Sequence, residues 1–172
     1  MRKQKGFSLI ELLIVVAIIL IIAAIAIPNL LRSRMAANEA SAVGSTRTIN
    51  TGQVTYAATY PQDGFAFALT NLGGASPCTP SQTTGCIIDN VLAQGSKSGY
   101  TITSVGTGGA GTAAAPTAPN TGYLTNSIPQ TEGTTGTRGF CSDQAGVIYF
   151  NTTGVSVTDA VCVGGGTETA LQ

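Results

Sequence analysis

The stretch that determines the fold is residues 7–27, FSLIELLIVVAIILIIAAIAI. From Leu12 to Ile27 every residue is apolar, and Leu30 and Leu31 extend the run beyond Pro28. The run of about 25 residues would form a helix about 37 Å long, at about 1.5 Å per residue. That length exceeds the hydrocarbon core of a bilayer, which is about 30 Å thick. The sequence therefore predicts one membrane-spanning helix near the N-terminus.

Basic residues flank this run on both sides. Arg2, Lys3 and Lys5 precede it, and Arg32 and Arg34 follow it. The N-terminal flank is the shorter and more basic one, and a large downstream part is translocated regardless of its charge. We therefore expect the N-terminus in the cytoplasm and the remainder outside the inner membrane.

Glu11 is the one charged residue within the apolar run. A carboxylate at the centre of a membrane helix costs about 2.5–3.5 kcal/mol on insertion scales. One interpretation is that Glu11 lies near the interface and extends to the lipid headgroups. The other is that it has a charged partner within the membrane.

The segment Lys5-Gly6-Phe7-Ser8-Leu9-Ile10-Glu11-Leu12 resembles the class III signal of type IV pilins and pseudopilins. The resemblance implies that a prepilin peptidase cuts after Gly6 and methylates the new N-terminal residue, Phe7. Glu11 then corresponds to the family's acidic residue at the fifth mature position, and Pro28 to its helix-kinking proline. The likeness continues more loosely through Arg34-Met35-Ala36-Ala37-Asn38-Glu39-Ala40.

The resemblance suggests a partner for Glu11. Cleavage would free the amine of Phe7, which stays basic after methylation. A neighbouring helix shifted by about one turn would bring that amine beside Glu11, and pairing in low dielectric offsets part of the desolvation cost. Glu11 would thus set the register between subunits, as a single buried polar residue does in a coiled coil.

An ordinary secretory signal peptide is the rival interpretation of the N-terminus. Ala24-Ile25-Ala26 fits a small-x-small cleavage site, which would release a soluble chain beginning at Ile27. Glu11 inside the core, a core longer than usual and Pro28 just past the cut all argue against it.

Composition excludes several functions. The 172 residues have a formal net charge of zero, so the sequence indicates no nucleic-acid site. There is no His, which removes the commonest general base and metal ligand, and no catalytic constellation is recognisable. We expect no enzymatic activity, no cofactor and no metal. Only 9% of the residues are charged, which suits an exported protein, and loss of the leader would make the mature chain mildly acidic.

The rest of the chain predicts an α+β fold. After a kink at Pro28, helical spacing continues over residues 29–60 and stops at Pro61. Residues 65–81 are expected to form a loop, and residues 87–94 a short helix that Gly95 ends. Four strands are predicted, in an antiparallel sheet that packs on the long helix: Tyr100–Val105, Tyr123–Ile128, Arg138–Ser142 and Val147–Phe150. A type I turn over residues 143–146 would join the last two. The expected parts are a cleaved leader (1–6), a transmembrane or filament-core helix (7–31) and an α+β domain (32–172).

Three further patterns have ordinary interpretations. Gly106, Gly108 and Gly111 match dinucleotide-binding spacing, but the prolines that follow oppose the required helix, so residues 106–119 are expected to form a mobile surface loop. Asn151 begins a formal N-glycosylation sequon that we expect to be unmodified. The aromatic residues in positions 56–67 are expected to pack between helix and sheet.

The four cysteines are expected to form disulfides, as is usual in exported proteins. Of three possible connectivities we favour Cys78–Cys86 and Cys141–Cys162. The first pair closes a short loop containing Pro80 and Gly85. The second would join the third strand to the C-terminal segment, and resembles by its position the disulfide-bounded C-terminal region of many pilins.

The resemblance implies a structural subunit of a type IV pilus, a helical filament of many copies used for adhesion, motility or DNA uptake. Its partners would be the inner membrane before assembly, the prepilin peptidase and the pilus assembly machinery; the pilus itself would be extracellular. Two alternatives stay open: a pseudopilin in the periplasmic pseudopilus of a type II secretion system, and a soluble secreted binding protein.

Overall fold

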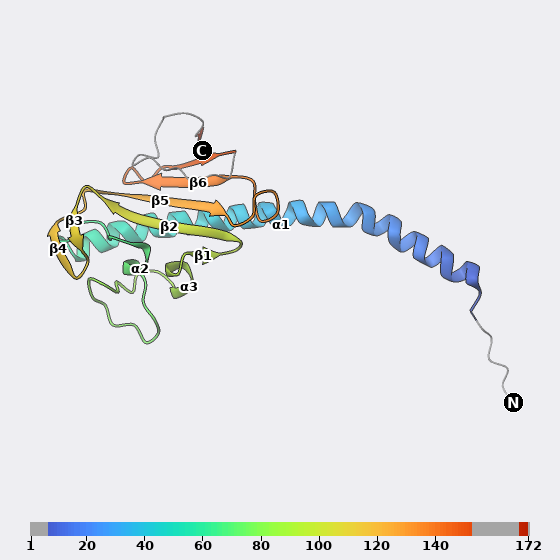
Figure 1. The fold of residues 1–172 in the computed structure, drawn as a ribbon, viewed down its shortest axis with the longest axis horizontal. Helices are drawn as coiled ribbons and strands as arrows, with labels where there is room; N and C mark the ends of the chain where they lie inside the picture. Colours follow the sequence, from blue (N-terminus) through green and yellow to red (C-terminus); the bar gives the residue numbers. More distant parts are fainter. Residues whose placement is uncertain (1–6, 153–168, 172) are drawn as a thin grey trace. The chain divides into compact units, whose positions relative to one another are not determined.

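A computed structural model of the chain describes residues 7–152 and 169–171. The chain divides into two compact units after Arg34, residues 1–34 and residues 35–172. The first contains the apolar part of helix α1, and the second contains the remainder of α1 and a β-sheet (Figure 1). The α+β class predicted from the sequence is confirmed.

Helix α1 runs from Leu9 to Thr59 without a break. It continues through Pro28, as the helical spacing after that residue predicted. The helix ends just before Pro61, which cannot donate the next backbone hydrogen bond. The sequence predicted this end to within one residue.

Within the second unit, six strands form one antiparallel sheet in the order β1-β2-β5-β6-β7-β8. Their bounds are β1 Ser96–Lys97, β2 Tyr100–Thr107, β5 Gly122–Pro129, β6 Gly139–Asp143, β7 Ile148–Asn151 and β8 Thr169–Ala170. The four predicted strands correspond to β2, β5, β6 and β7. The expected number of about four strands was too low, because β1 and β8 have only two residues each and no alternating pattern.

The β6–β7 hairpin forms as the turn chemistry predicted. The amide of Gly146 donates to the carbonyl of Asp143 at 2.9 Å, which closes the turn. The Asp143 side chain accepts a further bond from the amide of Ala145 at 2.9 Å. Gly146 has a φ of 75°, a conformation that glycine adopts at little cost.

One face of the second part of α1 packs against the sheet (Figure 1). Ile49 and Tyr56 are fully buried there, beside polar side chains that are hydrogen-bonded across the layer. Thr46 pairs with Ser127 at 3.0 Å, and the amide of Gln53 donates to Ser104 at 3.0 Å. Aromatic rings contribute as expected, since Tyr56 contacts Tyr60 and Phe65 contacts Tyr123.

Gly52 of α1 has a packing role that propensity alone does not show. A Cβ at this position would lie 3.2 Å from a methyl carbon of Ile88, so the glycine lets residues 87 and 88 approach the helix closely. The glycine penalty of about 1 kcal/mol relative to alanine is therefore offset by contacts that a larger residue would disturb. At Gly44 a Cβ would meet nothing within 4 Å.

Three predicted loop or helix segments are different in the structure. Residues 65–81 include a short helix, α2 (Leu69–Leu72). The predicted helix 87–94 shortens to α3 (Asn90–Ala93), because the Asp89 carboxylate caps its N-terminus by accepting from the amide of Leu92 at 2.9 Å. Residues 106–119 are not wholly a loop: strands β3 (Ala110–Thr112) and β4 (Ala115–Ala118) pair as a separate hairpin.

Candidate functional site

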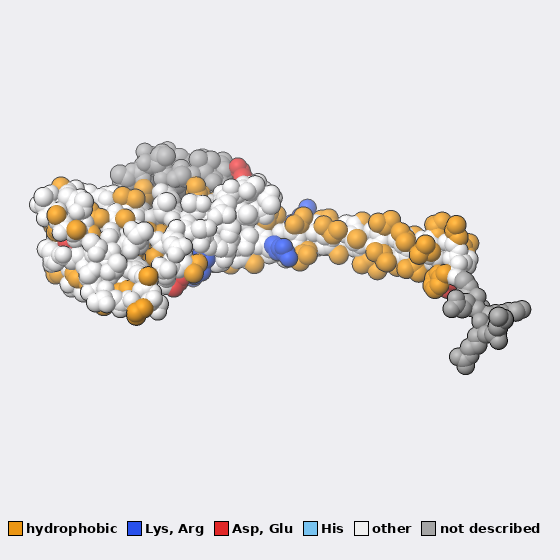
Figure 2. All heavy atoms as spheres, turned by 60° about the horizontal axis from the view of Figure 1, so that its bottom comes forward, with side chains coloured by type: hydrophobic (Ala, Val, Ile, Leu, Met, Phe, Trp, Pro, Cys, Tyr) orange, Lys and Arg blue, Asp and Glu red, His pale blue; other side chains and the backbone are white. Residues whose placement is uncertain are grey.

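The apolar part of α1 is exposed on all sides within its unit. Leu9 retains 77% of its accessible surface and Ile25 retains 66%, whereas large apolar residues in the second unit are mostly buried. Figure 2 shows hydrophobic side chains covering this segment. Among the described residues, α1 is the one helix with the length and apolar character needed to cross a membrane. A surface of this kind needs lipid or protein around it.

Glu11 lies in the first turn of α1. Its amide donates to the carbonyl of Ser8 at 3.1 Å, and the amide of Leu12 donates to the same oxygen at 3.2 Å. A carboxylate in a first helical turn is favoured by the partial positive charge of the helix N-terminus. The Glu11 side chain is exposed, and none of the ion pairs between described residues includes it. Residues 1–6 lie outside the described part, so the cleavage site at Gly6–Phe7 and the methylation of Phe7 stay predictions.

Pro28 lies inside α1, within the apolar segment. The structure places Phe7, Glu11 and Pro28 along one segment, but it does not bring them together at one point. Their predicted roles belong to an interface between helices, which a single subunit does not contain.

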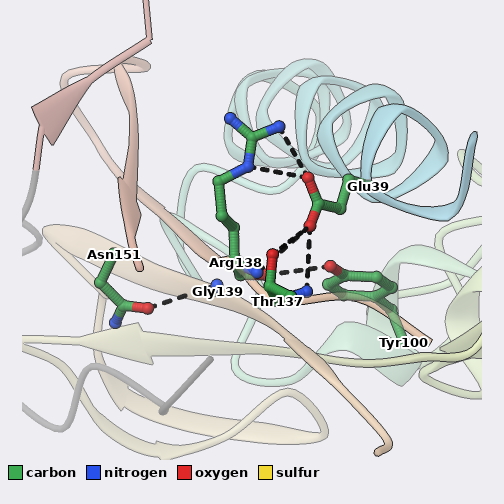
Figure 3. A network of polar contacts seen from close by, with 6 residues as sticks. All are labelled: Glu39, Tyr100, Thr137, Arg138, Gly139 and Asn151. Carbon is green, nitrogen blue, oxygen red and sulfur yellow. Dashed lines mark hydrogen bonds and ion pairs between the residues drawn. The ribbon is translucent and has the colours of Figure 1, made fainter. Parts of the chain in front are cut away.

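Glu39, on the part of α1 that belongs to the second unit, is hydrogen-bonded to Thr137 and Arg138 just before β6 (Figure 3). Its Oε2 accepts from Nε of Arg138 at 2.7 Å and lies 2.6 Å from Nη2 of the same guanidinium. Its Oε1 accepts from the amide of Thr137 at 3.0 Å, from the Thr137 hydroxyl at 3.1 Å and from the amide of Arg138 at 3.3 Å. Both oxygens of a side chain that is only 9% exposed are therefore satisfied.

Neighbouring aromatic residues hold Arg138 in place beside Glu39. The Tyr100 hydroxyl donates to the carbonyl of Arg138 at 2.9 Å, and the guanidinium lies over the rings of Phe140 and Phe150 at 5.8 and 5.4 Å. Burial raises the pKa of Glu39, but the hydrogen bonds from Thr137 and Arg138 and the charge of Arg138 outweigh it and hold that pKa below its ordinary value. The pKa of Tyr100 is raised by burial and by the nearby charge of Glu39.

This network was not predicted from the sequence. Glu39 is the one acidic residue between Glu11 and Asp63, and its place on the buried face of α1 was a usable signal. Its partner, 99 positions away, could not be identified without the sheet topology.

The predicted disulfide Cys78–Cys86 is present. Cys141 on β6 is also disulfide-bonded. Its predicted partner, Cys162, lies outside the described residues, so the second pairing stays a prediction.

Asn151, the first residue of the sequon, is only 6% exposed, and its side-chain oxygen accepts from the amide of Gly139 at 3.3 Å (Figure 3). An asparagine held in this way is a poor acceptor for a glycan. No group of His, Cys, Asp and Glu residues in the described part of the chain is arranged to hold a metal ion.

Comparison with known proteins bears on the N-terminal segment. Residues 1–27 match the family described as "Prokaryotic N-terminal methylation motif". Over 39 residues the chain is 67% identical to the type IV wide pilus major component PilA4 of Thermus thermophilus, a match covering 23% of this chain and 30% of that protein. The match thus spans less than a third of the relative's length. No solved structure matches the chain.

The methylation motif, the apolar helix that follows it and the similarity to a pilus component are properties of one class of protein. In this N-terminal segment, the chain is similar to proteins of the type IV pilin family. That family consists of structural subunits.

Proposed function

We propose that this protein is a structural subunit of a type IV pilus, and that it assembles into a filament through the apolar part of α1. The observation that carries the proposal is the fully exposed apolar segment behind a methylation motif. Such a segment is stable in a bilayer before assembly, and the same surface can be covered by equivalent helices of other copies afterwards. The similarity to a major component of the Thermus wide pilus favours a pilus over other assemblies.

Processing and location follow from the same proposal. A prepilin peptidase would cut between Gly6 and Phe7 and methylate the amine of Phe7. The precursor would cross the inner membrane once with its N-terminus in the cytoplasm, and the assembly machinery would then extract it into an extracellular filament. The buried side chains described in the second unit build a packed core, which suits a subunit with a structural role.

The first test is the mature N-terminus of the exported protein. We expect intact-mass measurement and N-terminal sequencing to show a chain that begins with N-methylated Phe7. A chain beginning at Ile27 would instead identify a signal-peptidase product and support the soluble secreted alternative. The variant Gly6→Leu should accumulate as uncut, membrane-bound precursor. The matched control is Gly44→Ala, which changes a distant glycine with open space around it and should be processed normally.

The second test separates a pilus from a periplasmic pseudopilus, since both would begin at Phe7. Filaments sheared from intact cells are expected to contain this protein as a major constituent. If the processed protein is found only in the periplasm, and its loss abolishes secretion of folded enzymes, the pseudopilin alternative is correct.

A further inference from the structure

A cavity of about 400 Å³ lies in the second unit, between α1 and the turn that joins β6 to β7. Its size is within the range of about 300–1,000 Å³ that is usual for small-molecule sites. Residues 50–55 of α1 line one side, residues 144–146 of the turn line the other, and Tyr123 of β5 reaches it from the sheet. All of these residues belong to the second unit, so the cavity is a feature of that unit alone.

Tyr123 brings an unpaired hydroxyl to this cavity. The residue is only 1% exposed, and its ring packs on that of Phe65 with 5.0 Å between the centroids. No hydrogen bond joins its hydroxyl to any residue that the structure describes, whereas the hydroxyls of the equally buried Tyr56 and Tyr100 both have partners. Burial, with a smaller contribution from the charge of Asp143, raises the pKa of Tyr123 to about 12. The hydroxyl therefore keeps its proton at neutral pH and can donate it to a ligand.

Asn50 fixes the two sides of the cavity relative to each other. Its side-chain nitrogen donates to the hydroxyl of Ser142 on β6 at 2.7 Å and to the carbonyl of Gly146 in the turn at 3.3 Å. The turn itself is closed by the bond from the amide of Gly146 to the carbonyl of Asp143. The cavity is thus held open beside Tyr123 by contacts within the chain, and a ligand would meet a preformed site.

The lining of the cavity is uncharged and combines hydroxyl, amide and apolar groups. The hydroxyls of Thr51 and Thr55 donate to helix carbonyls four residues earlier, at 3.1 and 2.9 Å, so only their acceptor capacity is left for a ligand. The side-chain amide of Gln144 has no hydrogen bond to a described residue and can both donate and accept. Val54 adds an apolar side chain that is 62% exposed.

These properties select a class of ligand. A charged ligand would lose its hydration without gaining a counter-charge from the lining. A wholly apolar ligand would cover the Tyr123 hydroxyl and leave it without a partner. A neutral molecule with several hydroxyl groups and one apolar C–H face meets both conditions, because its hydroxyls donate and accept while its C–H face covers Val54 and Ala145.

We propose that this cavity binds a neutral sugar ring, with the Tyr123 hydroxyl donating to a sugar oxygen and Gln144 pairing with a sugar hydroxyl. The C–H face of the ring lies on Val54. This inference goes beyond the proposed function and does not depend on it, since the residues that carry it all lie within the second unit of one subunit.

The test measures binding of glucose, galactose and N-acetylglucosamine to the full-length protein in a detergent without a sugar headgroup. Ligand-observed NMR and isothermal titration calorimetry should show saturable binding of at least one of these sugars, with one site per subunit. Tyr123→Phe removes only the hydroxyl and should weaken that binding by about threefold to tenfold. Tyr149→Phe, which removes the hydroxyl of a half-buried tyrosine outside the lining, is the matched control and should bind the sugar normally.

A second variant closes the cavity without changing the core. Ala145 is exposed in the turn and lines the cavity, so the larger side chain of Ala145→Phe should fill it and abolish sugar binding. The denaturant midpoint of this variant should match that of the unmodified protein. If Tyr123→Phe does not fold, Ala145→Phe decides the result.

Three results would overturn the proposal. The first is no saturable binding of any of the three sugars, and the second is equal binding by the unmodified protein and Ala145→Phe. The third concerns Arg47, which lines a neighbouring cavity that shares Gly146. If glucuronic acid binds more tightly than glucose and Arg47→Gln removes that preference, the ligand is an anion held by the arginine. The proposed function is tested separately, since a protein that binds sugar but forms no filament would contradict only the pilus assignment.

Discussion

At the scale of the residue, Glu39 joins α1 to the residues that lead into β6. A buried carboxylate is stable only when its oxygens are satisfied, and here five contacts converge on it from Thr137 and Arg138. Because Arg138 remains 41% exposed, the pair is partly screened by water. Its stabilising effect lies between those of a surface pair and a fully buried one.

Glu39→Gln is expected to lower the free energy of unfolding by about 1–3 kcal/mol, because the carboxylate charge that pairs with Arg138 is lost and the amide nitrogen cannot accept the hydrogen bonds of the oxygen that it replaces. Chemical denaturation of the mature protein in detergent, followed by near-ultraviolet circular dichroism, measures this change. Glu132→Gln, which changes an exposed carboxylate, is the control and should have little effect. Equal stabilities for the two variants would contradict this account of Glu39.

The same residue predicts a pH dependence of stability. The pKa of Glu39 is lower in the folded protein than in the unfolded chain, so the unfolded state binds the proton more readily. The stabilisation is complete above the ordinary carboxyl pKa of about 4.3 and is lost as the pH falls through the lower folded value. Glu39→Gln should therefore be less sensitive to acid than the unmodified protein over this range.

At the scale of the element, the chain's patterns predicted what periodicity and turn chemistry encode. The continuous apolar run and the following helical spacing predicted α1, and Asp143 with Gly146 predicted the β6–β7 hairpin. Strands β3 and β4 were missed because their short Gly-, Ala- and Pro-rich segments each contain a single Thr and no Val, Ile or aromatic residue typical of strands. The length of α3 was overestimated because Asp89 was not recognised as its cap.

The second disulfide is the prediction that belongs to this scale. Strand β6 carries Cys141, which is disulfide-bonded, and β7 lies beside it with Cys141 opposite Tyr149. We expect Cys162 to be the partner, joining β6 to the C-terminal segment. The stabilisation would be about 3 kcal/mol for a closed loop of this size. Peptide mapping of the non-reduced exported protein tests the pairing, and a Cys141 peptide linked to any other cysteine would refute it.

Replacing both Cys141 and Cys162 by serine should lower stability and filament yield without affecting membrane insertion, since the apolar segment is unchanged. Replacing Cys78 and Cys86 together is the comparison. That bridge closes a much shorter loop, with a sequence separation of 8, and in the chain-entropy model its loss should destabilise less.

At the scale of the whole molecule, the two units have opposite relations to water. The second unit buries its apolar residues and satisfies most of its polar ones internally, whereas the apolar segment of the first unit is exposed along its length. In a single subunit the second unit therefore has a packed core, whereas the apolar segment of the first unit remains exposed. The N-terminal motif predicts roles for Phe7, Glu11 and Pro28, and these roles stay predictions because the contacts proposed for them would form between copies.

Glu11→Ala tests that view directly. Removing the carboxylate removes a charge from the apolar segment, so the variant should insert into the membrane at least as well as the unmodified protein. What it loses is the partner of a neighbour's Phe7 amine, which would then be buried without a counter-charge on assembly. We therefore expect normal amounts of processed subunit in the inner membrane and a strong loss of sheared filaments.

Two variants distinguish charge from shape at this position. Glu11→Gln keeps the size and hydrogen-bonding capacity of the side chain but not its charge, and it should assemble about as poorly as Glu11→Ala. Leu12→Ala removes apolar surface next to it and should reduce assembly less, because many other apolar contacts of the segment remain. If Glu11→Ala enters filaments as efficiently as the unmodified subunit in the same cell, the charge is not needed for assembly.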